Sequence, residues 1–141
     1  MLGVMVVMIY LLLPLLSFAQ SQPDVFVFKS IATSQTIRNK DGKIIHEKTN
    51  REDGIPIVVD FGHAEVKTYG AAPIKITNYK PIKAYEDKDG NAVQTASGID
   101  KSGTQCAIVL IMYKRPLSSG GIAMLDISYP LIDLAFELGK P

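Results

Sequence analysis

The amino-acid sequence predicts an all-β fold, either a single antiparallel sandwich or a small barrel of about eight to ten short strands. Three observations support this prediction. Short stretches rich in β-branched and aromatic residues alternate apolar with polar side chains, which is the period of a strand. Turn signals built from glycine, aspartate and asparagine separate these stretches at intervals of about 8–12 residues. Beyond residue 19, no window of about 12 residues or more shows a helical period.

The longest apolar stretch after residue 19 is 105–113, QCAIVLIMY, and we expect it to be the central strand. Because strand side chains alternate, one face of this stretch carries Cys106, Ile108, Leu110 and Met112. The other face carries Ala107, Val109, Ile111 and Tyr113. Since both faces are apolar, the strand is expected to be covered on both sides.

The same alternation predicts the other strands. In chain order they are residues 25–31, 43–48, 55–61, 64–69, 74–77, 79–86, 93–99 and 122–129. Residues 32–38 are polar, so they are expected either to extend the first strand or to form an exposed edge. Pro81 lacks a backbone donor, which places its strand at an edge of the sheet or at a bulge.

Turn chemistry and the C-terminal segment complete the pattern. The Asp-Gly pairs at 41–42 and 89–90 predict tight hairpin turns, because these residues readily take positive φ values. Residues 114–121, KRPLSSGG, predict a loop. Residues 131–138 fit a short helix nearly as well as a strand, and the strand is favoured because the spacing and the neighbouring segments are β.

Residues 1–19, MLGVMVVMIYLLLPLLSFA, contain no charged residue and end in Ser17-Phe18-Ala19. An apolar run followed by small residues at these positions is typical of a secretory signal peptide. We therefore expect cleavage after Ala19, a single all-β domain of residues 20–141, and a secreted or periplasmic protein. The alternative is a membrane anchor formed by residues 1–19, because their length approaches the minimum that spans a bilayer.

The charges are nearly balanced, with 15 Lys and Arg residues against 14 Asp and Glu residues and no block of either sign. This balance gives no electrostatic reason to expect nucleic-acid binding. A membrane contact is expected only if the leader is retained as an anchor. The expected partner is therefore an unidentified protein, a surface or a small apolar ligand.

The residues that commonly serve in catalysis or metal binding do not form the required patterns in this sequence. His46 and His63 lack the close spacing of metal ligands and are expected on the solvated surface. Residues 87–91, DKDGN, begin like a calcium loop, but glycine and glutamate are missing from the required later positions, so a hairpin turn is predicted. Cys106 has no basic neighbour in sequence, which indicates a packed, unreactive thiol. No catalytic residue, cofactor or metal ligand is predicted, and the chain is not expected to be an enzyme.

Part of the sequence resembles small secreted β domains of uncharacterised bacterial proteins. The resemblance covers about half of the chain and is carried by the strand 57–61 (IVVDF), by residues 100–103 (DKSG) leading into 106–109 (CAIV), and by 127–129 (ISY). A broader likeness is to lipocalin-like barrels, which implies a barrel that carries a small apolar ligand. The G-x-W motif of lipocalins is absent because the chain has no tryptophan, so no functional residue is transferred from that family.

Two functions from different classes follow. The first is an exported, non-catalytic binding or interaction domain that presents a sheet face or loops to a partner. The second is a lipocalin-like carrier of a small apolar ligand in a barrel cavity. The candidate ligand-facing residues are Cys106, Ile108, Leu110, Met112 and Tyr129. Side chains that fill the interior favour the interaction domain, whereas a void of several hundred cubic ångströms lined by these residues favours the carrier.

Overall fold

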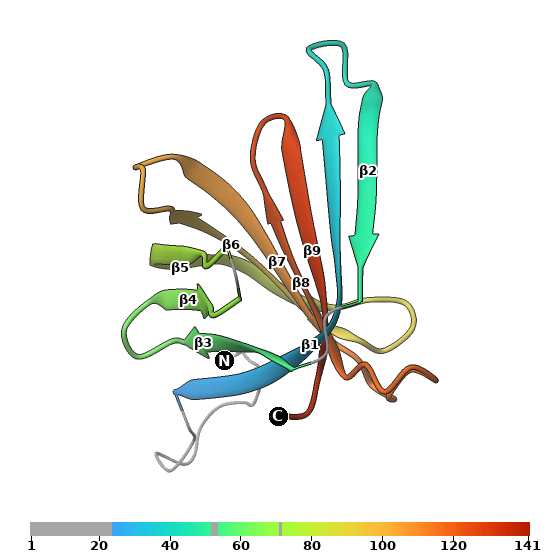
Figure 1. Ribbon diagram of the computed structural model, residues 1–141. Helices are drawn as coiled ribbons and strands as arrows, with labels where there is room; N and C mark the ends of the chain where they lie inside the picture. The colour runs from blue at the N-terminus through green and yellow to red at the C-terminus, as the bar shows by residue number, and fades with distance from the viewer. Residues whose placement is uncertain (1–23, 52–53, 71) are drawn as a thin grey trace.

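A computed structural model describes residues 24–51, 54–70 and 72–141, and these residues form nine strands and no helix (Figure 1). The strands are β1 (Val25–Arg38), β2 (Ile44–Asn50), β3 (Ile55–Asp60), β4 (Glu65–Thr68), β5 (Lys75–Glu86), β6 (Ala92–Ile99), β7 (Gln105–Met112), β8 (Ala123–Ser128) and β9 (Ile132–Gly139). The all-β prediction is confirmed. The predicted leader, residues 1–19, lies outside the described residues. Within the described part, helices able to cross a membrane are absent.

The strands form a closed antiparallel barrel with one additional strand. From β3 to β9 each strand pairs with the next, β3 also pairs with β1, and β9 returns to pair with β1. This ring contains eight of the nine described strands, so the barrel is the correct one of the two predicted architectures. The ninth, β2, pairs with β1 alone, and the β1–β2 hairpin extends beyond the rest of the barrel (Figure 1).

The long strand β1 belongs both to the barrel and to the β1–β2 hairpin. Its first half pairs with β3 from Val25 to Ser30, and its second half pairs with β2 from Thr33 to Arg38. On its other side it pairs with β9, with a register shift between Ser30 and Ala32. This bulge changes which residues face inward, because one extra residue reverses the alternation of side chains. The polar segment 32–38 thus extends the first strand.

Three hairpin turns are stabilised by the same side-chain to backbone hydrogen bonds. The Asp-Gly pairs predicted two of these three turns. Each turn begins with Asn39, Asp87 or Asp100, whose side-chain Oδ1 accepts hydrogen bonds from the backbone N–H groups two and four residues later. The glycine three residues after each of them has a φ of 82–84°, a conformation that suits glycine. The signature is therefore Asn or Asp with glycine three residues later, and the Asp-Gly pair is its second half in two of the three turns.

Two strand predictions are refined by the structure. The predicted strands 74–77 and 79–86 are one strand, β5, which is irregular at Asn78, where φ is 54°, and shifts register on both sides of Pro81. The bulge expected from Pro81 is therefore present. Residues 132–139 form strand β9 and not a helix.

The core fills the inside of the barrel. Side chains without solvent exposure come from strands all around the ring: Ile57, Val66, Ile76, Ile108, Ile127 and Leu138. Gly98 allows Ile76 to reach this interior, because a Cβ at position 98 would lie only 2.3 Å from Cγ2 of Ile76. The prediction that both faces of β7 are covered is wrong. Its outer face belongs to the barrel exterior, where Ala107 is exposed and Val109 and Ile111 are half-buried.

Candidate functional site

The structure brings the predicted ligand-facing residues together at the barrel interior. Cys106, Ile108 and Leu110 are buried in the core, and Met112 and Tyr129 are half-buried and pack against it. Across the sheet, Ile108 pairs with Ala96 and Ile127, and both of these neighbours are buried. These residues are thus in contact with other side chains of the barrel, and their role toward a ligand stays a prediction.

The thiol of Cys106 is packed as expected. The residue is 5% exposed, and its Sγ donates a weak hydrogen bond to the backbone oxygen of Gly98 at 3.6 Å. Burial, together with the negative charge of Asp100, raises the pKa of this thiol. Because the thiolate is the reactive form, a raised pKa makes the cysteine a poor nucleophile.

Three aromatic side chains are in contact near β3. Phe26 and Phe61 meet edge to face with ring centroids 5.6 Å apart, and Phe61 and Tyr79 meet in the same way at the same distance. Tyr79 is buried, and its hydroxyl donates a hydrogen bond to Oε1 of Gln94 on β6. Burial raises the pKa of Tyr79, so its hydroxyl stays protonated and neutral.

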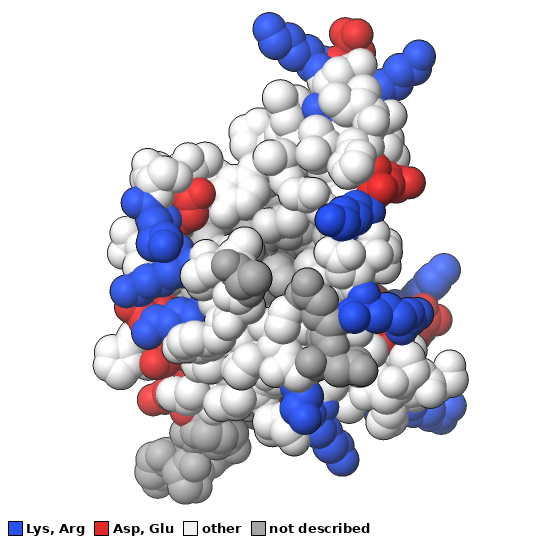
Figure 2. Space-filling view, viewed as in Figure 1, with Lys and Arg blue, Asp and Glu red and all other residues white. Residues whose placement is uncertain are grey.

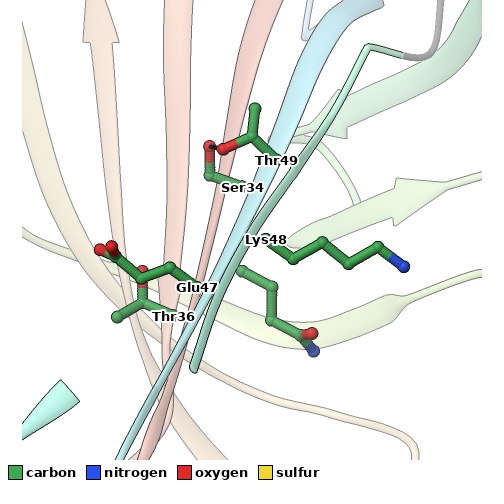
Figure 3. Close-up of a pocket in the computed structure, with 6 residues that line it drawn as sticks. Ser34, Thr36, Glu47, Lys48 and Thr49 are labelled. Carbon is green, nitrogen blue, oxygen red and sulfur yellow. Dashed lines mark hydrogen bonds between the residues drawn. The ribbon is translucent and has the colours of Figure 1, made fainter. Parts of the chain in front are cut away.

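Two of the hollows on the described surface lie outside the barrel core. One, of about 200 Å³, is lined by residues of the β1–β2 hairpin, Ser34, Gln35, Thr36, Glu47, Lys48 and Thr49. Figure 3 shows that these side chains leave the hairpin in different directions, with Ser34 and Thr49 joined by a hydroxyl–hydroxyl hydrogen bond of 3.2 Å. The other, of about 260 Å³, lies between the β5–β6 turn and the β7–β8 loop. Neither hollow is lined by the predicted ligand-facing residues.

A pair of carboxyl groups lies on the outer face of the barrel. Asp126 on β8 and Asp133 on β9 are linked by the hydroxyl of Ser128, which is 3.0 Å from Oδ1 of Asp126 and 2.6 Å from Oδ1 of Asp133. Burial, together with the neighbouring Asp133, raises the pKa of Asp126 to about 6. The hydrogen bond with Asp126 lowers the pKa of Asp133, and Arg38 lowers it further. The pair therefore shares one proton at mildly acidic pH.

Replacing Asp126 by asparagine is expected to increase the free energy of unfolding at pH 7.5 by about 1 kcal/mol. A folded-state pKa above the ordinary value favours the protonated form, so stability from Asp126 is present at low pH and is lost as pH rises from about 4 to 6. The amide keeps a donor toward Asp133 without ionising. The full shift would correspond to about 3 kcal/mol, and partial exposure reduces it.

Urea denaturation of both proteins between pH 4 and pH 8 checks this expectation. The exposed Asp89→Asn variant, which removes the same charge, is the matched control and should follow the pH dependence of the wild type. Equal pH dependence for Asp126→Asn and wild type would show that the carboxyl pair does not share a proton.

The histidines and the calcium-like segment have ordinary surroundings. His63 has a side chain that is 79% exposed, and its Nδ1 lies 2.9 Å from Oδ2 of Asp60. His46 is exposed on β2. The carboxylate of Asp87 accepts hydrogen bonds from the backbone N–H groups of its own turn, and these hydrogen bonds lower its pKa. Among the described residues, no group of three or more His, Cys, Asp or Glu side chains is placed to hold a metal ion.

One structural feature was missed by the sequence reasoning, namely the edge of β2 that faces away from β1. The segment was predicted only as an exposed strand, and its seven residues are all exposed. The signal was the polar run from His46 to Asn50, which has no apolar face to bury in the barrel. In comparisons with known proteins, no family model, curated protein or solved structure matches the chain. The likeness to lipocalin-like barrels is supported by the closed antiparallel architecture alone.

Proposed function

We propose that the mature chain is an exported, non-catalytic interaction module that binds its partner on the outside of the barrel. The observation that carries this proposal is the occupied interior. Ile57, Ile108 and Leu138 come from different parts of the ring, and each is completely shielded from solvent by other side chains. An eight-stranded barrel is about wide enough to be filled by side chains or to hold one small ligand. Here the buried side chains favour a barrel that is filled by its own residues.

The carrier function is the second candidate, and the closed ring of strands favours it. For a ligand to enter, side chains such as Leu110 and Met112 would have to move away from their neighbours, because they pack against the core cluster. Displacing packed side chains costs contact energy that the ligand must replace. The carrier therefore requires a barrel that opens.

Native mass spectrometry of the gently purified mature chain tests the two functions. We expect the mass of the polypeptide alone, and no binding of the hydrophobic probe 8-anilinonaphthalene-1-sulfonate by fluorescence. The Ile108→Ala variant, which creates space inside the barrel, is the control for probe access. A co-purified small molecule, or probe binding by the wild type that is lost in a Leu110→Trp variant, would favour the carrier and contradict the interaction module.

Export is tested separately by the mass of the protein found outside the cytoplasm. The proposal expects an N-terminus at Gln20, after cleavage behind Ala19. A protein that keeps residues 1–19 and sediments with membranes would instead support the anchored alternative.

A further inference from the structure

The edge of β2 that faces away from β1 has no strand beside it in the described part of the chain. Among the nine strands, β2 is in contact with β1 alone. All seven of its residues are exposed, and Figure 1 shows the hairpin standing away from the rest of the ring. An exposed strand edge is a template on which another extended segment can pair.

The backbone groups at this edge can be assigned from the structure. The N–H of Arg38 donates to the oxygen of Leu131, on the side of β9, at 2.8 Å. Since neighbouring residues in a strand direct their backbone groups to opposite sides, Gln35 and Ile37 direct theirs to β2. Their partners on β2, Lys48 and His46, direct their backbone groups toward β1. Glu47 and Thr49 therefore present their N–H and C=O groups at the free edge.

The other irregular edge of the sheet is a poorer template. Beyond its short pairing with β4 at Lys75 and Ile76, β5 continues to Glu86 with its second side unpaired by β4. This stretch contains Pro81 and shifts register on both sides of it. Proline removes a donor and bulges twist an edge, and both prevent strand addition. The regular edge of β2 is thus the better docking site.

The side chains of β2 decide which kind of strand fits. His46 and Lys48 lie on one face, and Glu47 and Thr49 lie on the other, while the exposed Ile44 and Ile45 add apolar surface near the turn. Side chains of both charge signs lie over the β1–β2 hairpin (Figure 2). None of the ion pairs among the described residues includes a residue of β2, so Lys48 has no carboxylate partner there. A second copy fits badly, because the antiparallel register that overlaps all of β2 places Glu47 opposite Glu47. Like charges directly opposite each other are destabilising.

We propose that the free edge of β2 binds an extended segment of a partner protein as an additional strand, and that this segment carries acidic side chains on the face shared with His46 and Lys48. This inference rests on the proposed interaction function and adds the binding site and the partner's chemistry. Backbone hydrogen bonds from Glu47 and Thr49 would provide the affinity, and carboxylates opposite Lys48 would provide the preference.

Two synthetic 12-residue peptides test the proposal, one alternating glutamate with threonine and one alternating lysine with threonine. We expect the glutamate peptide to shift the NMR signals of β2 and to slow amide exchange at Glu47 and Thr49. The lysine peptide should bind at least about tenfold more weakly, which corresponds to about 1.4 kcal/mol. A Lys48→Glu variant should reverse this preference.

Backbone pairing is tested with Thr49→Pro, which removes a free-edge N–H group and leaves the pairing with β1 intact. We expect a loss of affinity of about tenfold or more, whereas Thr49→Ala, which loses the same side chain, should bind like the wild type. Equal binding of both peptides, unchanged binding by Thr49→Pro, or signal shifts confined to other strands would overturn the proposal. The interaction function itself is tested by the native mass of the chain, and none of these three outcomes changes that mass. A failure of the β2 proposal is therefore distinguishable from a failure of the interaction function.

Discussion

Replacing Ile108 by alanine is expected to lower the free energy of unfolding by about 3–4 kcal/mol. The side chain is completely buried in the middle of β7, where it lies between Ala96 on β6 and Ile127 on β8. Removing its three outer carbon atoms takes away buried apolar surface and leaves a cavity in a ring that cannot easily contract, because its strands are held by hydrogen bonds on both sides. Urea denaturation followed by circular dichroism measures the change.

The matched control is Ile111→Ala on the same strand. Ile111 lies on the outer face and is only half-buried, so the same substitution is expected to cost about 1 kcal/mol or less. The comparison directly tests the inward and outward assignment of β7. Equal losses for the two variants would mean that a second layer covers the outer face.

Introducing proline at Ser34 is expected to cost about 3 kcal/mol or more, enough to prevent stable folding. Ser34 pairs with Ala135 of β9 and, by the alternation established at Arg38, directs its N–H group to that strand. Proline lacks this donor, so the variant loses a hydrogen bond between β1 and β9, the two strands that close the ring. Thermal unfolding monitored by circular dichroism, or the soluble yield if the protein does not fold, gives the result.

Two substitutions separate the backbone effect from other causes. Ser34→Ala loses the hydroxyl contact with Thr49 and keeps the N–H group, so it should change stability by about 1 kcal/mol or less. Gln35→Pro removes a donor directed to β2, which is an exposed hairpin strand, and should be tolerated better than Ser34→Pro. If Gln35→Pro were the more damaging change, β2 and not β9 would be the strand that stabilises β1.

Most strands were predictable because each buries one face. In β8 and β9 the alternation of Leu125 and Ile127, or of Phe136 and Leu138, with polar residues matches the inward and outward positions of the barrel. β7 was predicted as a strand because it lies in the longest apolar stretch after residue 19. Its apolar outer residues, however, suggested a second layer that the structure does not have, because the exterior of a barrel tolerates half-buried Val109 and Ile111.

The closure of the ring was beyond the sequence reasoning. It depends on the pairing of β1 with β9 and on the bulge at Ile31, and local patterns contain no information about which distant strands pair. The same bulge reverses the alternation within β1, so Phe28 and Thr33 share the inner face although a regular strand would separate them. Of the candidate site, the positions of the interior residues could be predicted, whereas the free edge of β2 depends on the complete pairing order.

The pairing of the first described strand with the last has a consequence for the order of folding. During synthesis, β1 leaves the ribosome early, but its partner β9 is complete only when Gly139 has been added. The ring therefore cannot close on a growing chain, and its closing contacts join residues that are distant in sequence, which is typical of slow-folding proteins. Under the export proposed above, late closure would leave the barrel unfolded until the whole chain is available.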